Sequence, residues 1–568
     1  MIIRKIKKFI WILNVLLIFN GVCLFAQSEE LKSLFYSVPY FETRTLNPVH
    51  GSYYIEGVQA NELMYSRLWT WKKDISETSD LVAGINSKSI RAMLRTPMEG
   101  SSLFSYKVQI RDDLKWPDGE LLTTEDIKFS FDLYRNEKTK SVLRDFLGVF
   151  KKIEIIDNRT IQFFIEGQDK HRAQYILPLV QILPQHKVIT PYLSKKSEFS
   201  NEPMGSGPFQ FVPKGQRGFA DKRDDRIVFK KNDNYYRWDE ENSNIGSVKV
   251  SVEKIVGTVI TKLINPNRAE DWSTLDMVLN VPNSPLNFSH LKDQGKDHLT
   301  FKPYKSNSWY GIAFNCEKPF LKNRNVRLAL SHAVNIASLI NDYYTTVKIA
   351  SADEPIAHRI SGPFNPLWGT GDGSLNPLIY DVSKAKGKLD SSNVVEKNDK
   401  RYFKNEAVQL KFIYNSGKVL QGSPEELIIA GLIKNIRNLG IKVKAVSYPA
   451  KDFSEKLKEG DYDLAFQYYE IGYGGNIAQL FTEGDLLNIS RFSDPSLTNF
   501  MNKFNRSRGN VKREYGKRIH QIIYKEAPYI FLYRLDKIMA YRDEELETNN
   551  QIVPKYFFTH IGEWYFKN

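Results

Sequence analysis

Histidine is the residue type in this chain with the widest chemistry, because imidazole both binds metals and exchanges a proton near neutral pH. No pair of histidines has the His-Glu-x-x-His spacing that places two imidazoles on one helical face around zinc. The sequence therefore predicts neither a metal site nor a resident cofactor, although ligands far apart in the chain could still converge. The histidines are His50, His171, His186, His290, His298, His332, His358, His520 and His560.

Two glycine-rich stretches share only part of a catalytic motif. Residues 369–373, GTGDG, lack the Gly-Lys-Ser/Thr ending of a phosphate-binding loop and are expected to form a turn. Residues 204–209, MGSGPF, lack the Gly-x-Ser-x-Gly of a nucleophile elbow. We find no cysteine–histidine pairing and no paired carboxylates, so we predict that the protein is not an enzyme. A triad built from residues distant in sequence stays open.

A cluster of acids lies within residues 116–135, WPDGELLTTEDIKFSFDLYR. Residues 117–119 are typical of a turn, because proline presets φ and glycine tolerates conformations that other residues avoid. Thr123 stands three residues before Asp126, the spacing at which a threonine caps a helix whose first acids favour the helix dipole. We therefore predict that these acids cap a helix and do not catalyse. Residues 104–110, just upstream, alternate as a half-buried strand does.

The elements that would position a site alternate between strand and helix patterns in the second half of the chain. Such a β-α-β-α-β order predicts a largely parallel sheet with helices on both faces. Ligands of such sheets bind in the crevice beyond the carboxyl ends of the strands. The elements are predicted at residues 410–416, 425–439, 441–448, 453–458 and 462–469.

Aromatic residues end and follow the last of these strands, at the edge where the crevice would lie. Tyr468, Tyr469, Glu470 and Tyr473 offer ring faces, hydroxyl groups and one charge within a glycine-containing segment. These four residues are candidate ligand-binding residues. An ordinary aromatic loop would have the same composition, so both interpretations stay open.

The first 26 residues have the pattern of a secretory signal peptide. Four cations precede the apolar run at residues 9–19, and Ala26 offers a small residue for cleavage. An uncleaved membrane anchor and a lipid attached at Cys23 are the alternatives, and the residues before Cys23 fit a lipoprotein signal poorly. We therefore expect an exported protein that begins near Gln27.

The composition is that of a large globular protein. Of its 568 residues 42% are hydrophobic, enough for two or more domains with their own cores. The only cysteine outside the signal is Cys316, so no intramolecular disulfide can form. The net charge is +14, but the lysines are spread along the chain, which favours solvated faces over a nucleic-acid site.

Several motifs resemble the extracellular solute-binding proteins of family 5, the oligopeptide- and dipeptide-binding proteins of ABC importers. Each motif alone is weak, and their order and spacing over nearly the whole mature chain carry the resemblance. The motifs are RTLNPVH (44–50), YKVQIRDDLKWPDGELLTTEDIKFSFD (106–132), EPMGSGPFQFV (202–212), FKKNDNYYRW (229–238), WYGIAFNCEKPFLKNRNVRLALSHAVNIASLI (309–340) and IYDVSKAKGKL (379–389).

The resemblance implies an α/β, two-lobed fold of the periplasmic-binding-protein type II-like class, with a hinge and a small inserted domain. Lobe II would span residues 301–519, and residues 70–201 would form the inserted subdomain of lobe I. The remaining lobe I segments would be residues 27–69, 202–300 and 520–568, after a signal peptide at 1–26. Trp309 and Tyr310 would begin a strand near the hinge and join the candidate ligand-binding residues.

The resemblance also implies a function: a monomeric periplasmic protein that captures oligopeptides by hinge closure and delivers them to ABC permease subunits. Peptide binders of this family often carry an aspartate after the strand that corresponds to residues 462–467, where it pairs with the peptide amine. Here Glu470 is the nearest acid. The ligand could therefore also be a metal complex, haem or an oligosaccharide, or the protein could be an envelope receptor or adhesin without transport.

Overall fold

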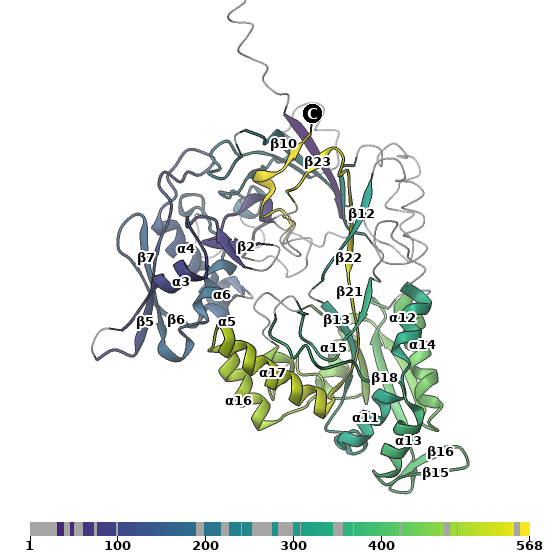
Figure 1. Ribbon diagram of the computed structural model, residues 1–568. Coiled ribbons are helices and arrows are strands. Elements are labelled where there is room, and N and C mark those ends of the chain that lie inside the picture. Colours follow the sequence, from purple (N-terminus) through teal and green to yellow (C-terminus); the bar gives the residue numbers. More distant parts are fainter. Residues whose placement is uncertain are drawn as a thin grey trace, which may run out of the picture.

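The computed structural model describes most of the chain after residue 30 (Figure 1). The predicted signal peptide and Tyr473 lie outside the described residues. The described residues are 31–38, 46–49, 61–72, 76–97, 100–141, 143–188, 198–216, 227–239, 241–252, 275–281, 299–306, 308–344, 356–366, 369–419, 423–470, 477–485, 487–549 and 557–567. None of the helices within these ranges is long and apolar enough to cross a bilayer.

One sheet collects strands from both ends of the chain. Within the described residues it has seven strands, and the central β1 pairs in parallel with β10 and β11. In spatial order the strands are β12 (Thr300–Tyr304), β22 (Lys537–Tyr541), β11 (Met277–Val281), β1 (Lys32–Val38), β10 (Ile245–Val252), β9 (Ile227–Lys231) and β8 (Phe209–Phe211).

A second sheet contains the predicted β-α-β-α-β run. Its three strands from that run pair in parallel, as predicted, but the pairings of the other three strands are antiparallel. The expectation of a largely parallel sheet is therefore wrong, and the sheet is mixed. In spatial order its strands are β14 (Ala357–Arg359), β21 (Tyr529–Leu535), β13 (Ser308–Phe314), β20 (Leu464–Glu470), β18 (Gln409–Asn415) and β19 (Lys442–Tyr448).

Helices cover both faces of this mixed sheet, as predicted (Figure 1). One face packs on α11 (Arg324–His332), α12 (Ile336–Tyr344) and α14 (Pro424–Arg437). The other face packs on α16 (Pro495–Asn505) and α17 (Gly509–Glu526). The further helices of this part are α10 (Pro319–Lys322), α13 (Val382–Asp390) and α15 (Ala450–Glu459), and its small hairpin sheet contains β15 (Val394–Lys397), β16 (Lys400–Phe403) and β17 (Glu406–Ala407).

A four-stranded sheet contains the strands on either side of the acid-rich segment at residues 116–135. Its strands, in spatial order, are β4 (Leu94–Arg95), β5 (Leu103–Gln109), β7 (Thr160–Glu166) and β6 (Phe150–Ile155). Around it lie β2 (Trp69–Trp71), β3 (Glu77–Ser79), α3 (Ser87–Met93), α4 (Thr124–Arg135), α5 (Arg144–Leu147), α6 (Ala173–Ile176) and α7 (Glu198–Asn201). A last small sheet, β23 (Leu546–Glu547) with β24 (Tyr565–Phe566), lies near the C-terminus.

Among the acids of residues 116–135, Asp126 has the capping role that the sequence predicts. Thr123 and Asp126 form a reciprocal capping box at the start of α4. The Asp126 carboxylate also accepts hydrogen bonds from the Trp116 indole at 3.2 Å and from the Gln185 backbone at 2.9 Å. This carboxylate joins the turn, the helix and a distant segment, and its oxygens are occupied by these donors.

The glycines of residues 204–209 serve packing. A Cβ atom on Gly205 would lie 2.0 Å from the Met64 carbonyl oxygen, and one on Gly207 would lie 2.5 Å from the Met64 carbonyl carbon. Only glycine lets the two backbone segments approach this closely. Gly207 uses the approach to donate a 2.7 Å hydrogen bond to Met64, so this motif is a contact between segments and no nucleophile elbow.

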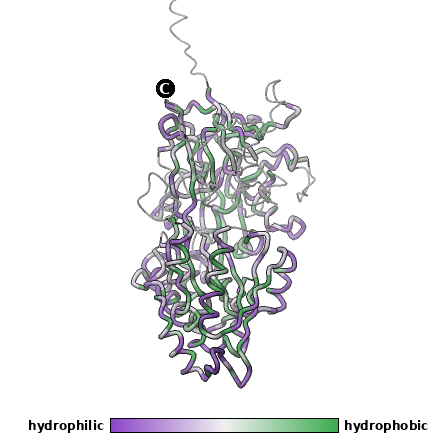
Figure 2. The backbone as a smooth tube through the Cα atoms, turned by 90° about the vertical axis from the view of Figure 1, so that its right-hand side faces the viewer, coloured by the Kyte–Doolittle hydropathy of each residue, from purple (hydrophilic) through white to green (hydrophobic). Residues whose placement is uncertain are grey.

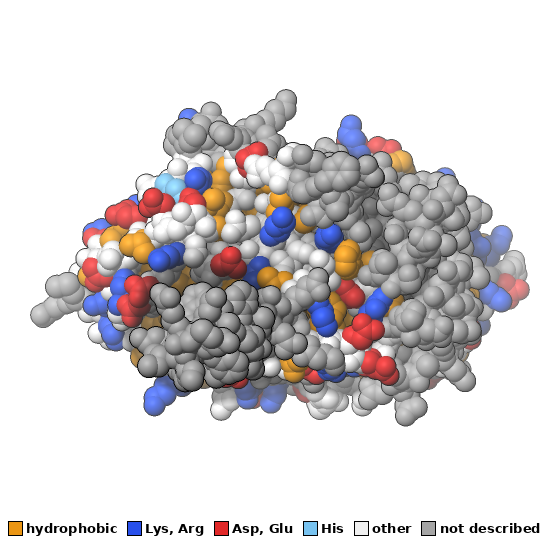
Figure 3. Space-filling view, turned by 90° about the horizontal axis from the view of Figure 1, so that it is seen from above, with side chains coloured by type: hydrophobic (Ala, Val, Ile, Leu, Met, Phe, Trp, Pro, Cys, Tyr) orange, Lys and Arg blue, Asp and Glu red, His pale blue; other side chains and the backbone are white. Residues whose placement is uncertain are grey.

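Hydrophobic side chains fill the space between these layers. Figure 2 shows hydrophobic stretches running through the interior, with hydrophilic stretches at the outer loops. Trp69, Trp116 and Trp564 are among the largest fully buried side chains, and they join the seven-stranded and four-stranded sheets in one core. On the surface seen in Figure 3, basic and acidic side chains are interspersed, which does not resemble a nucleic-acid-binding face.

Candidate functional site

Two short chain segments carry the backbone from one large sheet into the other (Figure 1). Lys305 and Ser306 lie on the segment between β12 of the seven-stranded sheet and β13 of the mixed sheet. Asp536 alone separates β21 from β22, which returns the chain to the seven-stranded sheet. Short strand-to-strand crossings can absorb a rotation while the sheets on either side move as rigid units.

The predicted limit of lobe II at residue 519 falls inside α17. The limits of the lobes stay a prediction.

Side-chain contacts hold the two crossings next to each other. The Ser306 hydroxyl donates to the Leu535 carbonyl oxygen at 2.6 Å. Asp536 is only 3% exposed. Its carboxylate lies 3.0 Å from the Lys305 ammonium and 2.8 Å from His358 Nε2. A buried carboxylate needs such donors, because an unpaired charge is costly away from water. The two crossings therefore form one paired hinge segment.

The candidate aromatic residues gather at the end of the mixed sheet that faces this hinge. Trp309 and Tyr310 of β13 pair with Tyr469 and Tyr468 of β20. Successive side chains of a strand point to opposite faces. Trp309 and Tyr469 accordingly stack at 4.5 Å on the face covered by α16 and α17, whereas Tyr310 packs on the opposite face.

On that opposite face Tyr310 belongs to a cluster of tyrosines around one acid. Its ring stacks on Tyr533 at 4.8 Å, and the Tyr533 hydroxyl lies 3.3 Å from that of Tyr344. Burial raises the pKa of the Glu425 carboxyl, although hydrogen bonds with Tyr310 and Ser423 act in the opposite direction. These groups contact one another within the protein, and Tyr310 is partly buried against them.

The structure thus separates the candidate ligand-binding residues. Trp309 is buried, at 3% exposure, whereas Tyr468 is 37% exposed. Glu470 is the last residue of β20, and its backbone pairs with Ser308 beside the hinge. Trp309 and Tyr310 lie on opposite faces, so only a ligand lying across the strand ends could contact both. The ligand-binding role of all six residues stays a prediction.

A contact that the sequence does not reveal joins the part with the four-stranded sheet to the helix pair α16–α17. The Lys512 ammonium of α17 lies 4.1 Å from the ring centroid of Tyr175 in α6 and 4.7 Å from that of Phe504 in α16. The lysine is 7% exposed, and this burial lowers its pKa to about 8. A lysine on a helix normally indicates a solvated face, so no sequence signal predicts its burial.

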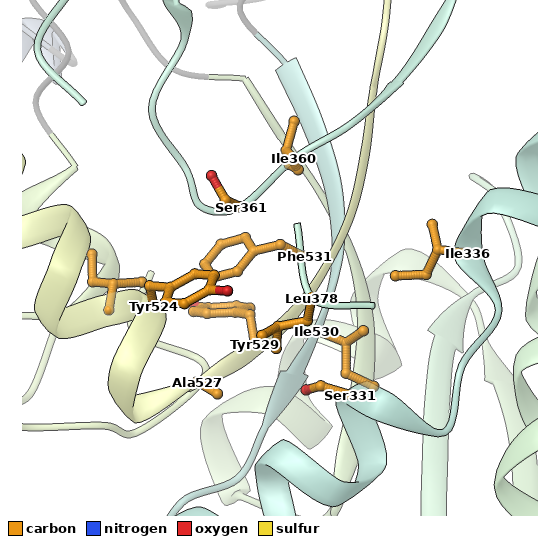
Figure 4. Close-up of a pocket in the computed structure, with 11 residues that line it drawn as sticks. Ser331, Ile336, Ile360, Ser361, Leu378, Tyr524, Ala527, Tyr529, Ile530 and Phe531 are labelled. Atoms are coloured by element: carbon orange, nitrogen blue, oxygen red, sulfur yellow. The ribbon is translucent and has the colours of Figure 1, made fainter. Parts of the chain in front are cut away.

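A small pocket lies next to the ring of Trp309, and Figure 4 shows the residues that line it. Ile360 and Ser361 approach it from the segment after β14, and Tyr524 approaches from the end of α17. Phe531 forms part of its wall and also lies 5.2 Å from the Trp309 ring. The lining is apolar with a few hydroxyl groups, and it contains no charged side chain.

Among the described residues, neither the pair of His520 and Ser361 nor Cys316 forms an activated nucleophile. The Asp372 backbone donates to His520 Nδ1 at 3.0 Å, so the neutral ring carries its proton on Nε2, which faces the Ser361 hydroxyl at 3.3 Å. A general base would need an unprotonated nitrogen there. Burial raises the pKa of the Cys316 thiol to about 11, which keeps it protonated. No cluster of three metal-ligating side chains occurs within the described ranges.

Comparison with known proteins gives a family and a fold. Residues 103–482 match the model of the bacterial extracellular solute-binding proteins, family 5 Middle. A provisional ABC transporter peptide-binding protein of Brucella ovis is 26% identical over 287 residues, which are 49% of this chain and 47% of that protein. The chain thus spans about half the length of the curated relatives that it matches first.

Two further relatives cover most of the chain. The oligopeptide-binding protein AppA of Bacillus subtilis is 22% identical over 81% of this chain and 80% of its own. Its structure in complex with a nonapeptide has a TM-score of 0.67 over 94% of this chain and 99% of its own, at 19% identity. NikZ of Campylobacter jejuni, solved with Ni(L-His), has a TM-score of 0.69 over 94% and 99%, also at 19% identity. These similarities confirm the predicted two-lobed α/β fold.

Proposed function

Because the chain belongs to the bacterial extracellular solute-binding proteins of family 5, we propose that it is the binding protein of an ABC importer. In this proposal it captures oligopeptides between its lobes by closing about the paired hinge segment, and it then delivers them to permease subunits. It acts as a monomer and performs no catalysis of its own.

The observation that carries the proposal is the hinge itself, placed beside aromatic strand ends. Two crossings, at Lys305 and Ser306 and at Asp536, lie side by side between the two large sheets. A ligand held between the lobes contacts both of them only in the closed form, so binding shifts the population toward that form. Tyr468 and Glu470 stand at the strand ends next to this hinge and are the proposed contacts from lobe II.

The proposal predicts that a bound oligopeptide reduces the radius of gyration in solution scattering and raises the thermal stability. A ligand at about 100 times its Kd, with no affinity for the unfolded chain, should stabilise the protein by about 2.7 kcal/mol. Scattering and thermal unfolding with and without the same peptide measure both quantities. A peptide that binds by calorimetry and leaves both unchanged would exclude hinge closure.

A metal chelate is a second candidate ligand, because NikZ was solved with Ni(L-His). A chelated metal can be held through the carboxylates and amines of the chelator, so the protein need not supply a cluster of metal ligands. Native mass spectrometry of the protein purified from its own host discriminates the two. A family of co-purified masses with amino-acid spacings supports peptides, whereas a single mass with a nickel isotope pattern supports the chelate.

For the mature protein we propose export with cleavage after Ala26 and a location in the periplasm. The family itself is extracellular, and the positive and apolar segments of the first 26 residues supply the export signal. N-terminal sequencing of the mature protein is expected to begin at Gln27. A mature chain that begins at a lipid-modified Cys23 would show that the protein is anchored to a membrane.

A further inference from the structure

The contact between Lys512 and Tyr175 joins parts of the protein that belong to different lobes in the predicted division. Tyr175 lies on α6, beside the four-stranded sheet, and Lys512 lies on α17, which packs on the mixed sheet. In Figure 1 these two helices lie next to each other, well away from the hinge. Rotation about the hinge would therefore make or break this contact.

The buried ammonium has aromatic and acidic surroundings. The rings of Tyr175 and Phe504 lie within 4.7 Å of it, and Glu77 of β3 favours its charged form electrostatically. The guanidinium of Arg508, at the start of α17, acts electrostatically on Tyr175 as well as on Tyr106 and His171. The end of the α16–α17 pair thus presents two cations to the aromatic surface beside the four-stranded sheet.

Two opposing effects act on Lys512 in this contact. Removing an ammonium from water costs free energy, as its lowered pKa reflects. A ring face offsets part of this cost, because a desolvated cation is attracted to the ring quadrupole. Phe504 belongs to the same helix pair as the lysine, so it accompanies Lys512 in any arrangement of the lobes. Tyr175 is the ring that the other side contributes, and Glu77 of β3 adds a favourable charge from that side.

We propose that Tyr175 and Lys512 form a latch between the lobes, a cation–ring contact that is made on closure and holds the closed form. The inference rests on the proposed hinge motion. It goes beyond that proposal because the latch acts without ligand. Removing the ring leaves the buried ammonium without an aromatic face across the interface, whereas removing both removes the buried charge as well, so the two changes differ in their effect.

The test measures the distance between the lobes in ligand-free protein by pulsed electron spin resonance. Spin labels are placed on the exposed positions Asp132 of α4 and Arg518 of α17, each replaced by cysteine in a Cys316→Ala background without the signal peptide. Tyr175→Phe keeps the ring and is the matched control for Tyr175→Leu. Tyr175→Leu combined with Lys512→Met removes the charge as well.

We expect Tyr175→Leu to reduce the ratio of closed to open molecules by roughly 5- to 30-fold, the equivalent of about 1–2 kcal/mol. Tyr175→Phe should keep the parent distance distribution. The double variant should lie between the parent and Tyr175→Leu, because it lacks the latch but no longer buries a charge. If Tyr175→Leu does not fold, Tyr175→Met replaces it. Equal distributions for the Leu and Phe variants, or a double variant as closed as the parent protein, would overturn the latch. Hinge closure by peptide would then still be testable in the parent protein.

Discussion

Replacing Glu62 by alanine is expected to lower the free energy of unfolding by about 3–5 kcal/mol, the range for breaking a buried ion pair. Glu62 pairs with Arg67, and both side chains are almost fully buried. The same carboxylate accepts a 2.7 Å hydrogen bond from Thr559, near the C-terminus. Arg67 in turn donates to the Pro178 carbonyl at 3.1 Å. The pair thus joins three segments that are distant in sequence, and truncating the acid leaves the Arg67 guanidinium buried without this carboxylate.

Urea denaturation followed by tryptophan fluorescence measures this loss. The matched control is Glu514→Ala. This change removes the ion pair between Glu514 and Lys517, whose two side chains are both largely exposed. That control should change the free energy of unfolding by less than about 1 kcal/mol, because water and salt screen exposed pairs. A Glu62→Ala variant no less stable than the control would mean that the buried pair contributes nothing net.

Replacing Glu470 by glutamine is expected to weaken binding of an oligopeptide with a free amino terminus by about 2–5 kcal/mol, the range for breaking a buried charge pair. The reason is that the peptide ammonium, enclosed in a closed cleft, needs a carboxylate partner. Glu470 ends β20 beside the hinge, and its backbone pairs with Ser308. Glutamine nearly keeps the shape of the side chain and removes only the charge.

Calorimetry on one peptide in free and N-acetylated form isolates this effect. The acetylated peptide carries no ammonium, so the variant should bind it as well as the parent does. Glu455→Gln, on the exposed side of α15 in the same part of the chain, is the matched control and should bind both forms normally. An equal loss for both peptides, or no loss for either, would exclude Glu470 as the amine partner.

Local patterns predicted the local elements well, because their determinants are close in sequence. The capping box of Thr123 and Asp126 and the strand at residues 103–109 follow from spacing alone. The motifs of the family, read in order, supplied the two-lobed fold. Periodicity could not give the direction of β13 and β21 in the mixed sheet, because strand direction depends on where the chain comes from and where it continues.

The candidate site was harder to predict than the fold. Trp309 and Tyr310 are neighbours in sequence, and they lie on opposite faces because a strand alternates its side chains. The burial of Lys512 arises from Tyr175, which the fold brings to it from far along the chain. The Asp536 cluster likewise combines Lys305 and His358 from separate segments. Such contacts between distant segments depend on the tertiary structure, which no single stretch of sequence encodes.

The position of β22 has a consequence for the order in which the molecule can be assembled. This strand lies between β12 and β11, yet it is formed by residues 537–541, close to the end of the chain. A polypeptide emerging from its amino end can build the mixed sheet up to β20 while β12 still lacks its neighbour in the seven-stranded sheet. Because β21 and β22 are nearly continuous, the last stretch to emerge would complete both sheets together. Loss of only the final thirty or so residues would therefore remove the strand that links β12 to β11, while leaving most of the chain's length intact.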